Sequence, residues 1–101
     1  MNINFEYHDV TASSALEEFA KEQVEKLVHK YDFIIRADIF FKMENTSSDE
    51  TGKIAGIRLS APGPRLFAEH SSKDFYESVK TAARELDSQL KKRKEKMKSH
   101  H

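Results

Sequence analysis

The sequence predicts an α+β fold, a two-layer sandwich in which a four-stranded mixed sheet carries two helices on one face. Four segments alternate apolar and polar residues, as half-buried strands do, and two segments repeat apolar residues at helical spacing. Their order along the chain is β-α-β-β-β-α. A chain of 101 residues can build one core without disulfides, so we expect residues 1–101 to form a single domain.

The first strand and the first helix come from the N-terminal third of the chain. Residues 2–8, NINFEYH, alternate as a strand does. A helix is predicted over residues 14–31, where Ser14 opens a capping box and Ser13 is the alternative N-cap. Its apolar positions are Leu16, Phe19, Ala20, Val24, Leu27, Val28 and Tyr31. The helix also supplies the right-handed crossover that parallel pairing of the first two strands requires.

Three further strands, expected to pair antiparallel, follow over residues 34–43, 53–61 and 65–70. The residues expected to face the helices are Ile35, Ala37, Ile39, Phe41, Met43, Ala55, Ile57, Leu59, Ala61, Leu66 and Ala68. The stretch 44–52 is polar and rich in Ser and Thr, as turns are. The connection Pro62-Gly63-Pro64 must be tight, because proline fixes φ and lacks a backbone donor.

The second helix is predicted to begin after Ser71 or Ser72 as N-cap, with Asp74 near its positive end. Its apolar stripe consists of Phe75, Val79, Ala82, Ala83, Leu86 and Leu90. The stripe stops at Leu90, yet residues 91–98 contain no helix breaker. We therefore expect the helix to overhang the body from about residue 91 by roughly 12 Å.

The charge of the chain is uneven although it sums to zero. Seventeen basic residues balance seventeen acidic residues, but residues 91–101 hold six basic residues and one acidic residue. Such a tail suits binding to phosphates, but it also suits an ordinary solvated helix end, where each lysine stabilises the helix dipole by about 0.3–1 kcal/mol. Composition alone leaves both interpretations open. The charges point to all sides of the helix, which argues against a membrane-surface helix with an apolar face.

The residues give no sign of a catalytic or metal site. The chain has no cysteine, three glycines and neither a phosphate-binding loop nor a nucleophile motif. The five histidines, His8, His29, His70, His100 and His101, lack the spacing of metal ligands. We therefore expect no enzyme activity, no cofactor and no metal. Because no apolar run reaches about 18 residues and no signal peptide is present, we expect a cytoplasmic protein without membrane contact.

Two surfaces are candidates for binding. The open sheet face is expected to carry Arg36, Phe40, Lys42, Ile54, Arg58, Arg65 and Phe67. Such a face can stack single-stranded nucleic acid, form a weak homodimer, or be a strand face partly covered by the 44–52 loop. The helices contribute Lys26, Lys30, Lys80 and Arg84, which are ordinary solvated surface unless the two helices pack side by side and align them with the basic tail.

Several short motifs, in order and at matching length, resemble one protein family. They are NINFEYHDV, ALEEF, Lys26-Leu27, Tyr31-Asp32 and DFYESV followed by LDSQLKKRKEKMKSH. The most specific are the Asp74-Phe75-Tyr76 start of the second helix and the basic residues after Gln89-Leu90, which alternate up to His100. On these residues the chain resembles the short ribosome hibernation-promoting factors and ribosome-associated inhibitors, also described as sigma-54 modulation proteins.

The resemblance implies a fold similar to a double-stranded-RNA-binding domain and a function without chemistry. It implies binding to the small ribosomal subunit and its ribosomal RNA, in the channel for messenger and transfer RNA, with translation blocked during stress or stationary phase. The residues expected to bind RNA are Lys26, Lys30, Lys80, Arg84, Lys91, Lys92, Arg93, Lys94, Lys96 and Lys98. The alternative is a small protein-interaction module that dimerises through the open sheet face.

The chain also departs from the family pattern. The second helix has Glu85, Asp87 and Ser88 where relatives often carry basic residues, and the first helix has Glu17 and Gln23 where relatives carry cations. The body is therefore less basic than the pattern of the family. We expect the tail to supply more of the affinity for RNA as a result.

Overall fold

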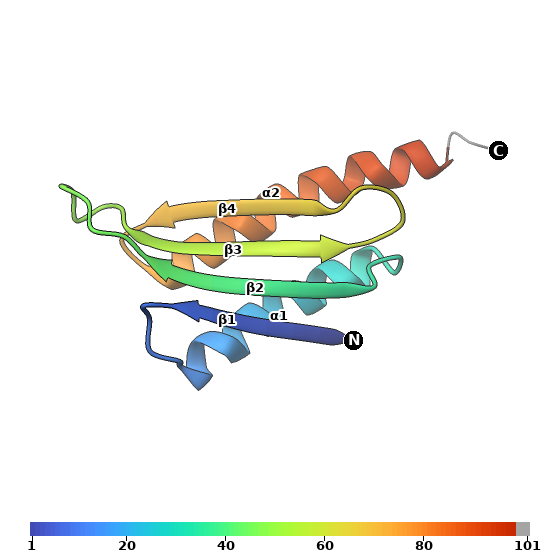
Figure 1. The fold of residues 1–101 in the computed structure, drawn as a ribbon. Coiled ribbons are helices and arrows are strands. Elements are labelled where there is room, and N and C mark those ends of the chain that lie inside the picture. Colours follow the sequence, from blue (N-terminus) through green and yellow to red (C-terminus); the bar gives the residue numbers. More distant parts are fainter. Residues whose placement is uncertain (99–101) are drawn as a thin grey trace.

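The computed structural model describes residues 1–98 and confirms the predicted order of elements (Figure 1). The elements are β1 (Asn2–His8), α1 (Ser14–Lys30), β2 (Arg36–Met43), β3 (Lys53–Ser60), β4 (Leu66–Ser72) and α2 (Phe75–Lys98). α2 runs unbroken to Lys98 and projects past the end of the sheet (Figure 1). The predicted features of His100 and His101 lie outside the described residues.

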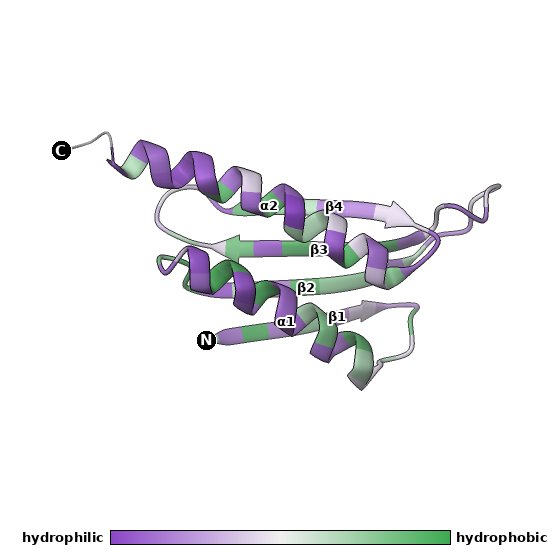
Figure 2. Cartoon of the chain, turned by 180° about the vertical axis from the view of Figure 1, so that it is seen from behind, coloured by the Kyte–Doolittle hydropathy of each residue, from purple (hydrophilic) through white to green (hydrophobic). Residues whose placement is uncertain are grey.

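The four strands form one mixed sheet in the order β1-β2-β3-β4. β1 and β2 are parallel, with Phe5 opposite Ile39, whereas the β2–β3 and β3–β4 pairs are antiparallel. α1 makes the crossover between the two parallel strands, and both helices cover the same face of the sheet (Figures 1 and 2). The predicted two-layer α+β sandwich is therefore confirmed.

The core lies between the sheet and the two helices. Its largest fully buried apolar side chains are Phe41, Ile39, Ile57, Leu59, Leu86, Leu90, Val24 and Val79. Burial of one such side chain contributes about 1.5–3 kcal/mol, so this layer fixes both helices on the sheet. In Figure 2 green and purple bands alternate along the part of α2 that covers the sheet, whereas its overhang is almost entirely purple. The apolar stripe of α2 thus ends where its core contacts end.

α1 begins at a side-chain cap on Ser13, the alternative of the two predicted caps. The Ser13 hydroxyl oxygen accepts a hydrogen bond from the Leu16 backbone N–H at 3.3 Å, and Tyr31 is the C-cap. Tyr7 of β1 ties the first turn of α1 to the sheet by donating a hydrogen bond to the Glu17 carboxylate. The pKa of Tyr7 is raised to about 12, mainly because the hydroxyl is partly buried and secondly because of this hydrogen bond.

α2 begins two or three residues later than predicted, and the expected cap at Ser71 or Ser72 is wrong. Both serines belong to β4, and Ser72 pairs with Lys53 at the end of the β3–β4 ladder. The cap is Asp74, whose carboxylate accepts a hydrogen bond from the Tyr76 backbone N–H at 2.8 Å. The helical hydrogen bonds begin only at the Asp74 carbonyl oxygen, so Asp74 and not Ser72 stands at the cap position, and the Ser72 hydroxyl instead accepts a hydrogen bond from the Asp74 backbone N–H at 3.2 Å.

Three apolar residues depart from the alternation read in the strands. Ile35 is 65% exposed and Met43 is 45% exposed, although both were expected to face the helices. Ile35 precedes β2 and Met43 is its last residue, so both lie at the margin of the sheet. Ile54, expected on the open face, is buried at 5% exposure, with Lys42 and Ser71 opposite it on the neighbouring strands.

Candidate nucleic-acid interface

A groove runs between α1 and α2, and we call it the interhelix groove. It consists of two adjoining hollows that share Lys30, Arg84 and Asp87. The charged residues that line it are Lys26, Lys30, Lys80, Arg84, Asp87, Lys91, Lys94, Glu95 and Lys98. The structure therefore brings four predicted cations of the body together with three cations of the tail, because the helices pack side by side.

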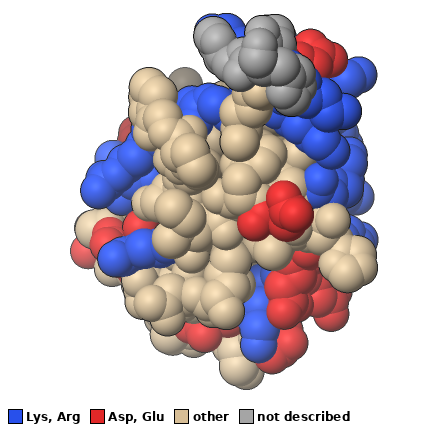
Figure 3. All heavy atoms as spheres, turned by 90° about the vertical axis from the view of Figure 1, so that its right-hand side faces the viewer, with Lys and Arg blue, Asp and Glu red and all other residues tan. Residues whose placement is uncertain are grey.

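The cations of the tail fall into two sets. Lys91, Lys94 and Lys98 line the interhelix groove, because residues three and four apart share one face of a helix. Lys92, Arg93 and Lys96 lie outside the groove lining. Figure 3, which shows the end where α2 projects, has Lys and Arg gathered in its upper part and Asp and Glu mostly below them. At this end of the molecule positive charge is thus concentrated toward the projecting part of α2, which carries Lys91, Lys94 and Lys98.

Asp87 joins the two helices at the middle of the groove. One carboxylate oxygen accepts a hydrogen bond from the Tyr31 hydroxyl at 2.6 Å, and the other lies 2.7 Å from the Lys30 ammonium. The ammonium groups of Lys30 and Lys94 lie 5.5 and 5.9 Å from the centre of the Tyr31 ring. The acidic residue that set this chain apart from the family pattern therefore anchors the C-terminal end of α1 to α2.

This network shifts the pKa values of its members in consistent directions. Hydrogen bonds from Lys30, and then from Tyr31, hold the pKa of Asp87 below its ordinary value. The same hydrogen bonds to Asp87 raise the pKa of Lys30 and of Tyr31. Near neutral pH the pair is therefore fully ionised, and Asp87 offsets part of the positive charge of the groove.

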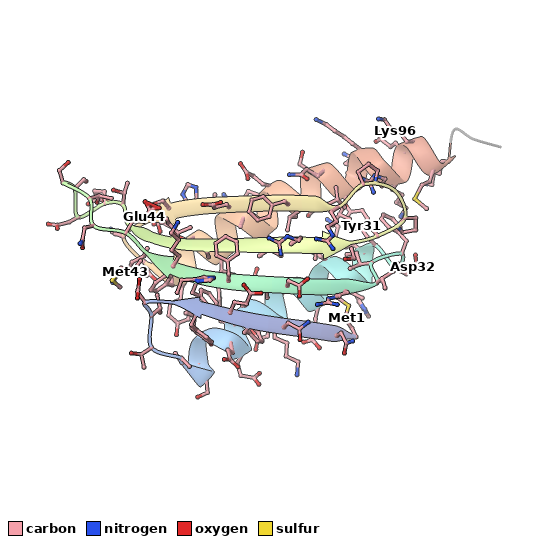
Figure 4. All side chains as sticks on the ribbon, in the orientation of Figure 1. Met1, Tyr31, Asp32, Met43, Glu44 and Lys96 are labelled. Atoms are coloured by element: carbon pink, nitrogen blue, oxygen red, sulfur yellow. The ribbon has the colours of Figure 1, made fainter. Side chains whose placement is uncertain are left out.

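The overhang of α2 carries its cations beyond the body of the protein. Figure 4 shows Lys96 on the overhang and Tyr31 near the end of α1, both at the same end of the molecule, with Met43 and Glu44 at the opposite end. Arg93 differs from its neighbours because its guanidinium donates hydrogen bonds to the Pro62 and Pro64 carbonyl oxygens, at 2.6 and 2.8 Å.

The open sheet face has an aromatic centre. The Phe40 ring lies directly over Gly56, where an added Cβ would sit 2.1 Å from a ring carbon. The Phe67 ring is nearly parallel to it, with ring centres 6.1 Å apart, and Phe67 is 41% exposed. The Arg58 guanidinium lies 5.8 Å from the centre of the Phe67 ring. The predicted mixture of aromatic and basic residues is therefore present on this face.

Several of the predicted cations on this face are paired with carboxylates. Arg36 lies 3.1 Å from Asp38, and Lys42 lies 3.5 Å from Glu44. Burial alone would raise the pKa of Asp38, but hydrogen bonds from Arg36 and Asn4 outweigh it and keep this pKa below its ordinary value. Of the four cations predicted for this face, Arg36 and Lys42 therefore have a carboxylate beside them.

Among residues 1–98, no three His, Cys, Asp or Glu side chains lie together as a metal ion would need. Neither described helix is long and apolar enough to span a membrane.

The sequence did not reveal the roles of Asp87 and Arg93. Asp87 looked like a departure that weakens a basic helix, and Arg93 looked like one more cation of the tail. Their partners lie 29 or more residues away in the chain, so no local pattern marks them. The one available signal was the tight Pro62–Pro64 connection, whose carbonyl oxygens need donors from elsewhere.

Comparison with known proteins gives consistent relatives over almost the whole chain. The sequence profile of the family described as Sigma 54 modulation protein / S30EA ribosomal protein matches residues 3–98. The ribosome hibernation promoting factor of Pseudomonas putida is 27% identical over 99 residues, which cover 98% of this chain and 92% of that protein. The ribosome hibernation promoting factor of Klebsiella oxytoca is 28% identical over 100 residues, which cover 99% of this chain and all of that protein.

Solved structures agree with this assignment. A ribosomal subunit interface protein from Coxiella burnetii superposes with a TM-score of 0.80 at 26% identity, covering 93% of this chain and 98% of that one. The N-terminal domain of Protein Y from Thermus thermophilus superposes with a TM-score of 0.77 at 19% identity. The match covers 91% of this chain and 98% of that one, and the two share the fold. The chain therefore belongs to the Sigma 54 modulation protein / S30EA ribosomal protein family.

Proposed function

We propose that this chain is a ribosome hibernation factor that binds the ribosomal RNA of the small subunit and inhibits translation by occupying the channel for messenger and transfer RNA. The observation that carries the proposal is the interhelix groove, in which seven Lys and Arg residues face two carboxylates among the described residues. The names of the relatives from Pseudomonas putida and Klebsiella oxytoca support ribosome hibernation. The function needs no chemistry, since a protein lodged in the channel excludes other ligands sterically.

The shape of the groove suits a nucleic-acid backbone. It begins between the helices, near Lys26 and Lys80, and continues along the overhang to Lys98, with two of its cations on α1 and five on α2. Lysine is a point charge with three donors on a flexible stem, which tolerates phosphates in many orientations. Binding of this kind depends on salt, because each phosphate contact releases counterions.

The experiment that tests the proposal removes the three cations of the tail from the groove. The triple variant Lys91→Ala/Lys94→Ala/Lys98→Ala should bind purified small subunits more weakly and flatten the slope of log K against log salt by about 2–2.7, at about 0.7–0.9 per contact. The matched control, Lys21→Ala/Lys53→Ala/Lys73→Ala, removes the same charge outside the groove and should leave most of the slope. Equal slopes for both triple variants would contradict the assignment of the groove.

Sedimentation of ribosomes in sucrose gradients with the purified protein tests the partner. We expect the protein to travel with small subunits and with whole ribosomes and to be absent from isolated large subunits. Co-sedimentation with the large subunit alone would contradict the proposed partner. The same gradients report whether ribosome dimers form.

A second candidate function is weak self-association through the open sheet face. The exposed Phe67, stacked beside Phe40 and under Arg58, is the observation that favours it. Sedimentation equilibrium at high protein concentration should then show a dimer that Phe67→Asp abolishes while binding to small subunits persists. A wild-type protein that remains monomeric under these conditions would remove this candidate. Phe67 is preferred to Phe40 for the substitution, because Phe40 packs against the backbone of Gly56.

A further inference from the structure

Arg93 occupies a different environment from the rest of the overhang. Between residues 91 and 98, all of which the structure describes, it is the one side chain that is not exposed. Its Nη1 donates to the Pro62 carbonyl oxygen at 2.6 Å and its Nη2 to the Pro64 carbonyl oxygen at 2.8 Å. The planar fork of a guanidinium can satisfy two carbonyls at once, which a lysine ammonium cannot do in the same geometry.

Gly63 is shaped to receive this guanidinium. It has a φ of +95°, a backbone conformation that side chains rarely adopt, and an added Cβ would lie 3.0 Å from Nη1 of Arg93. The glycine therefore allows the tight turn between the two prolines and also leaves room for the arginine. The connection between β3 and β4 and the overhang of α2 fit each other at this point.

The apolar contacts of α2 end before this point. Leu90 is its last buried residue, and Met97, the one apolar residue between 91 and 98, is 42% exposed. One turn before Arg93, the Gln89 side chain donates to the Phe67 carbonyl oxygen at 3.0 Å. Gln89 and Arg93 are four residues apart, so the same helix face is attached first to β4 and then to the connection that precedes it.

We propose that Arg93 is a positioning residue of the RNA-binding surface and not a phosphate ligand. Its fork holds the overhang against the β3–β4 connection, and this fixes the direction in which Lys91, Lys94 and Lys98 present their charges. The inference rests on the proposed function of the interhelix groove and deepens it. It also gives the Pro62–Pro64 connection a part in binding without any contact to RNA.

The experiment separates the fork of Arg93 from its charge. Arg93→Lys keeps the charge and loses the fork, Arg93→Ala loses both, and Gly63→Ala disturbs the receiving turn without changing any charge. Gly52→Ala is the matched control for backbone strain, because Gly52 has a φ of +111° in the β2–β3 connection. Lys91→Ala is the control for the loss of one groove cation. Amide hydrogen exchange of residues 91–98 in the free protein and the salt dependence of binding to small subunits are measured for all variants.

We expect Arg93→Lys, Arg93→Ala and Gly63→Ala to speed amide exchange in residues 94–98 and to weaken binding about three- to tenfold, because binding must then order the overhang. The slope of log K against log salt should stay at the wild-type value in these variants. Lys91→Ala should instead flatten the slope by about 0.7–0.9 and leave exchange unchanged. Gly52→Ala should change neither exchange in the overhang nor binding.

Two results would overturn the inference. If Arg93→Lys matches the wild type in both exchange and affinity, charge alone matters at this position. If Arg93→Ala flattens the slope as Lys91→Ala does, with unchanged exchange, Arg93 is an ordinary phosphate ligand. Failure of the wild type to bind small subunits would instead overturn the proposed function, and the exchange measurements would still decide whether Arg93 holds the overhang.

Discussion

The two parts of α2 show how one continuous helix can serve two purposes. Residues 75–90 bury Val79, Ala82, Ala83, Leu86 and Leu90 against the sheet and α1. Residues 91–98 bury no apolar side chain and are attached through Arg93 to two backbone carbonyl oxygens. The first part is held by the hydrophobic effect, and the second by helix propensity and directional hydrogen bonds.

This difference explains how the strongly basic residues 91–98 can be held in one position without a buried apolar face. A buried stripe would need apolar residues on the overhang, and these would compete with the exposed cations that a phosphate backbone requires. Two hydrogen bonds from a single arginine fix the segment while its other side chains stay exposed. We therefore expect substitutions of the buried apolar residues between 75 and 90 to act on stability, and substitutions of the exposed cations between 91 and 98 to act on binding.

The largest expected effect on the stability of the protein is at the centre of the buried stripe of α2. Leu86→Ala should lower the free energy of unfolding by about 2–5 kcal/mol, because Leu86 is fully buried and its truncation leaves a cavity. Met97→Ala, on the overhang, should change it by less than about 0.5 kcal/mol, since Met97 is 42% exposed. Urea unfolding of both variants measures the two values. Similar losses at the two positions would mean that the overhang is also held by apolar packing.

The next effect concerns a buried polar contact in the same part of α2. Ser78 is fully buried, and its hydroxyl donates to the Lys53 carbonyl oxygen at 2.6 Å. Ser78→Ala should cost about 1–3 kcal/mol of unfolding free energy, because the Lys53 carbonyl and the buried Ser72 hydroxyl each lose a hydrogen-bond partner. The matched variant Ser88→Ala, at an exposed position of the same helix, should stay within about 0.5 kcal/mol of the wild type. Equal values from thermal or urea unfolding would show that the Ser78 contact contributes little.

The smallest effect on stability is expected at Asp87 in the interhelix groove. The same substitution is expected to strengthen binding. Asp87→Asn should destabilise the protein less than Ser78→Ala does, because the pair with Lys30 is largely exposed. It should also strengthen binding to small subunits by a factor below about ten, because one negative charge leaves the groove. Unfolding and binding titrations of the same preparation measure both changes. Weaker binding by Asp87→Asn would show that the anchoring of α1 matters more than the charge.

The pH dependence of this variant follows from the lowered pKa of Asp87. A carboxylate whose pKa is lower in the folded state stabilises the protein above its unfolded value, near 3.9, and this contribution disappears as pH falls through the folded value. The stability difference between the wild type and Asp87→Asn should therefore be constant at neutral pH and shrink in acid below about pH 4. A difference that grows in acid would contradict the role assigned to the hydrogen bonds at Asp87.

Much of the fold could be predicted because it depends on repeating patterns. The period of two in the strands and the helical spacing of residues such as Val24 and Leu86 predicted both layers and the element order. The predictions failed where a residue had two compatible roles. Ser72 is a residue type that favours helix caps, but it is the last residue of β4, and α2 begins only at Phe75, after Asp74. Ile35 and Met43 fitted the alternation but lie where the sheet ends.

The candidate site was predictable in composition and only partly in arrangement. Lys26, Lys30, Lys80 and Arg84 could be named, with the condition that the helices lie side by side, and the structure meets that condition. The division of the tail into a groove set and an outer set follows from the rotation of α2 on the sheet. That rotation is fixed by the buried residues up to Leu90 and not by the basic residues themselves.

Residue type and local spacing are enough to set the two layers of this protein, the continuation of α2 past Leu90 and the concentration of positive charge beyond it. Long-range packing sets which cations share the interhelix groove, the contact of Asp87 with α1, and the attachment of Arg93 to the Pro62–Pro64 connection. The reason is physical. A charged side chain has no preferred partner until packing of the core brings distant backbone and side-chain groups within hydrogen-bonding distance.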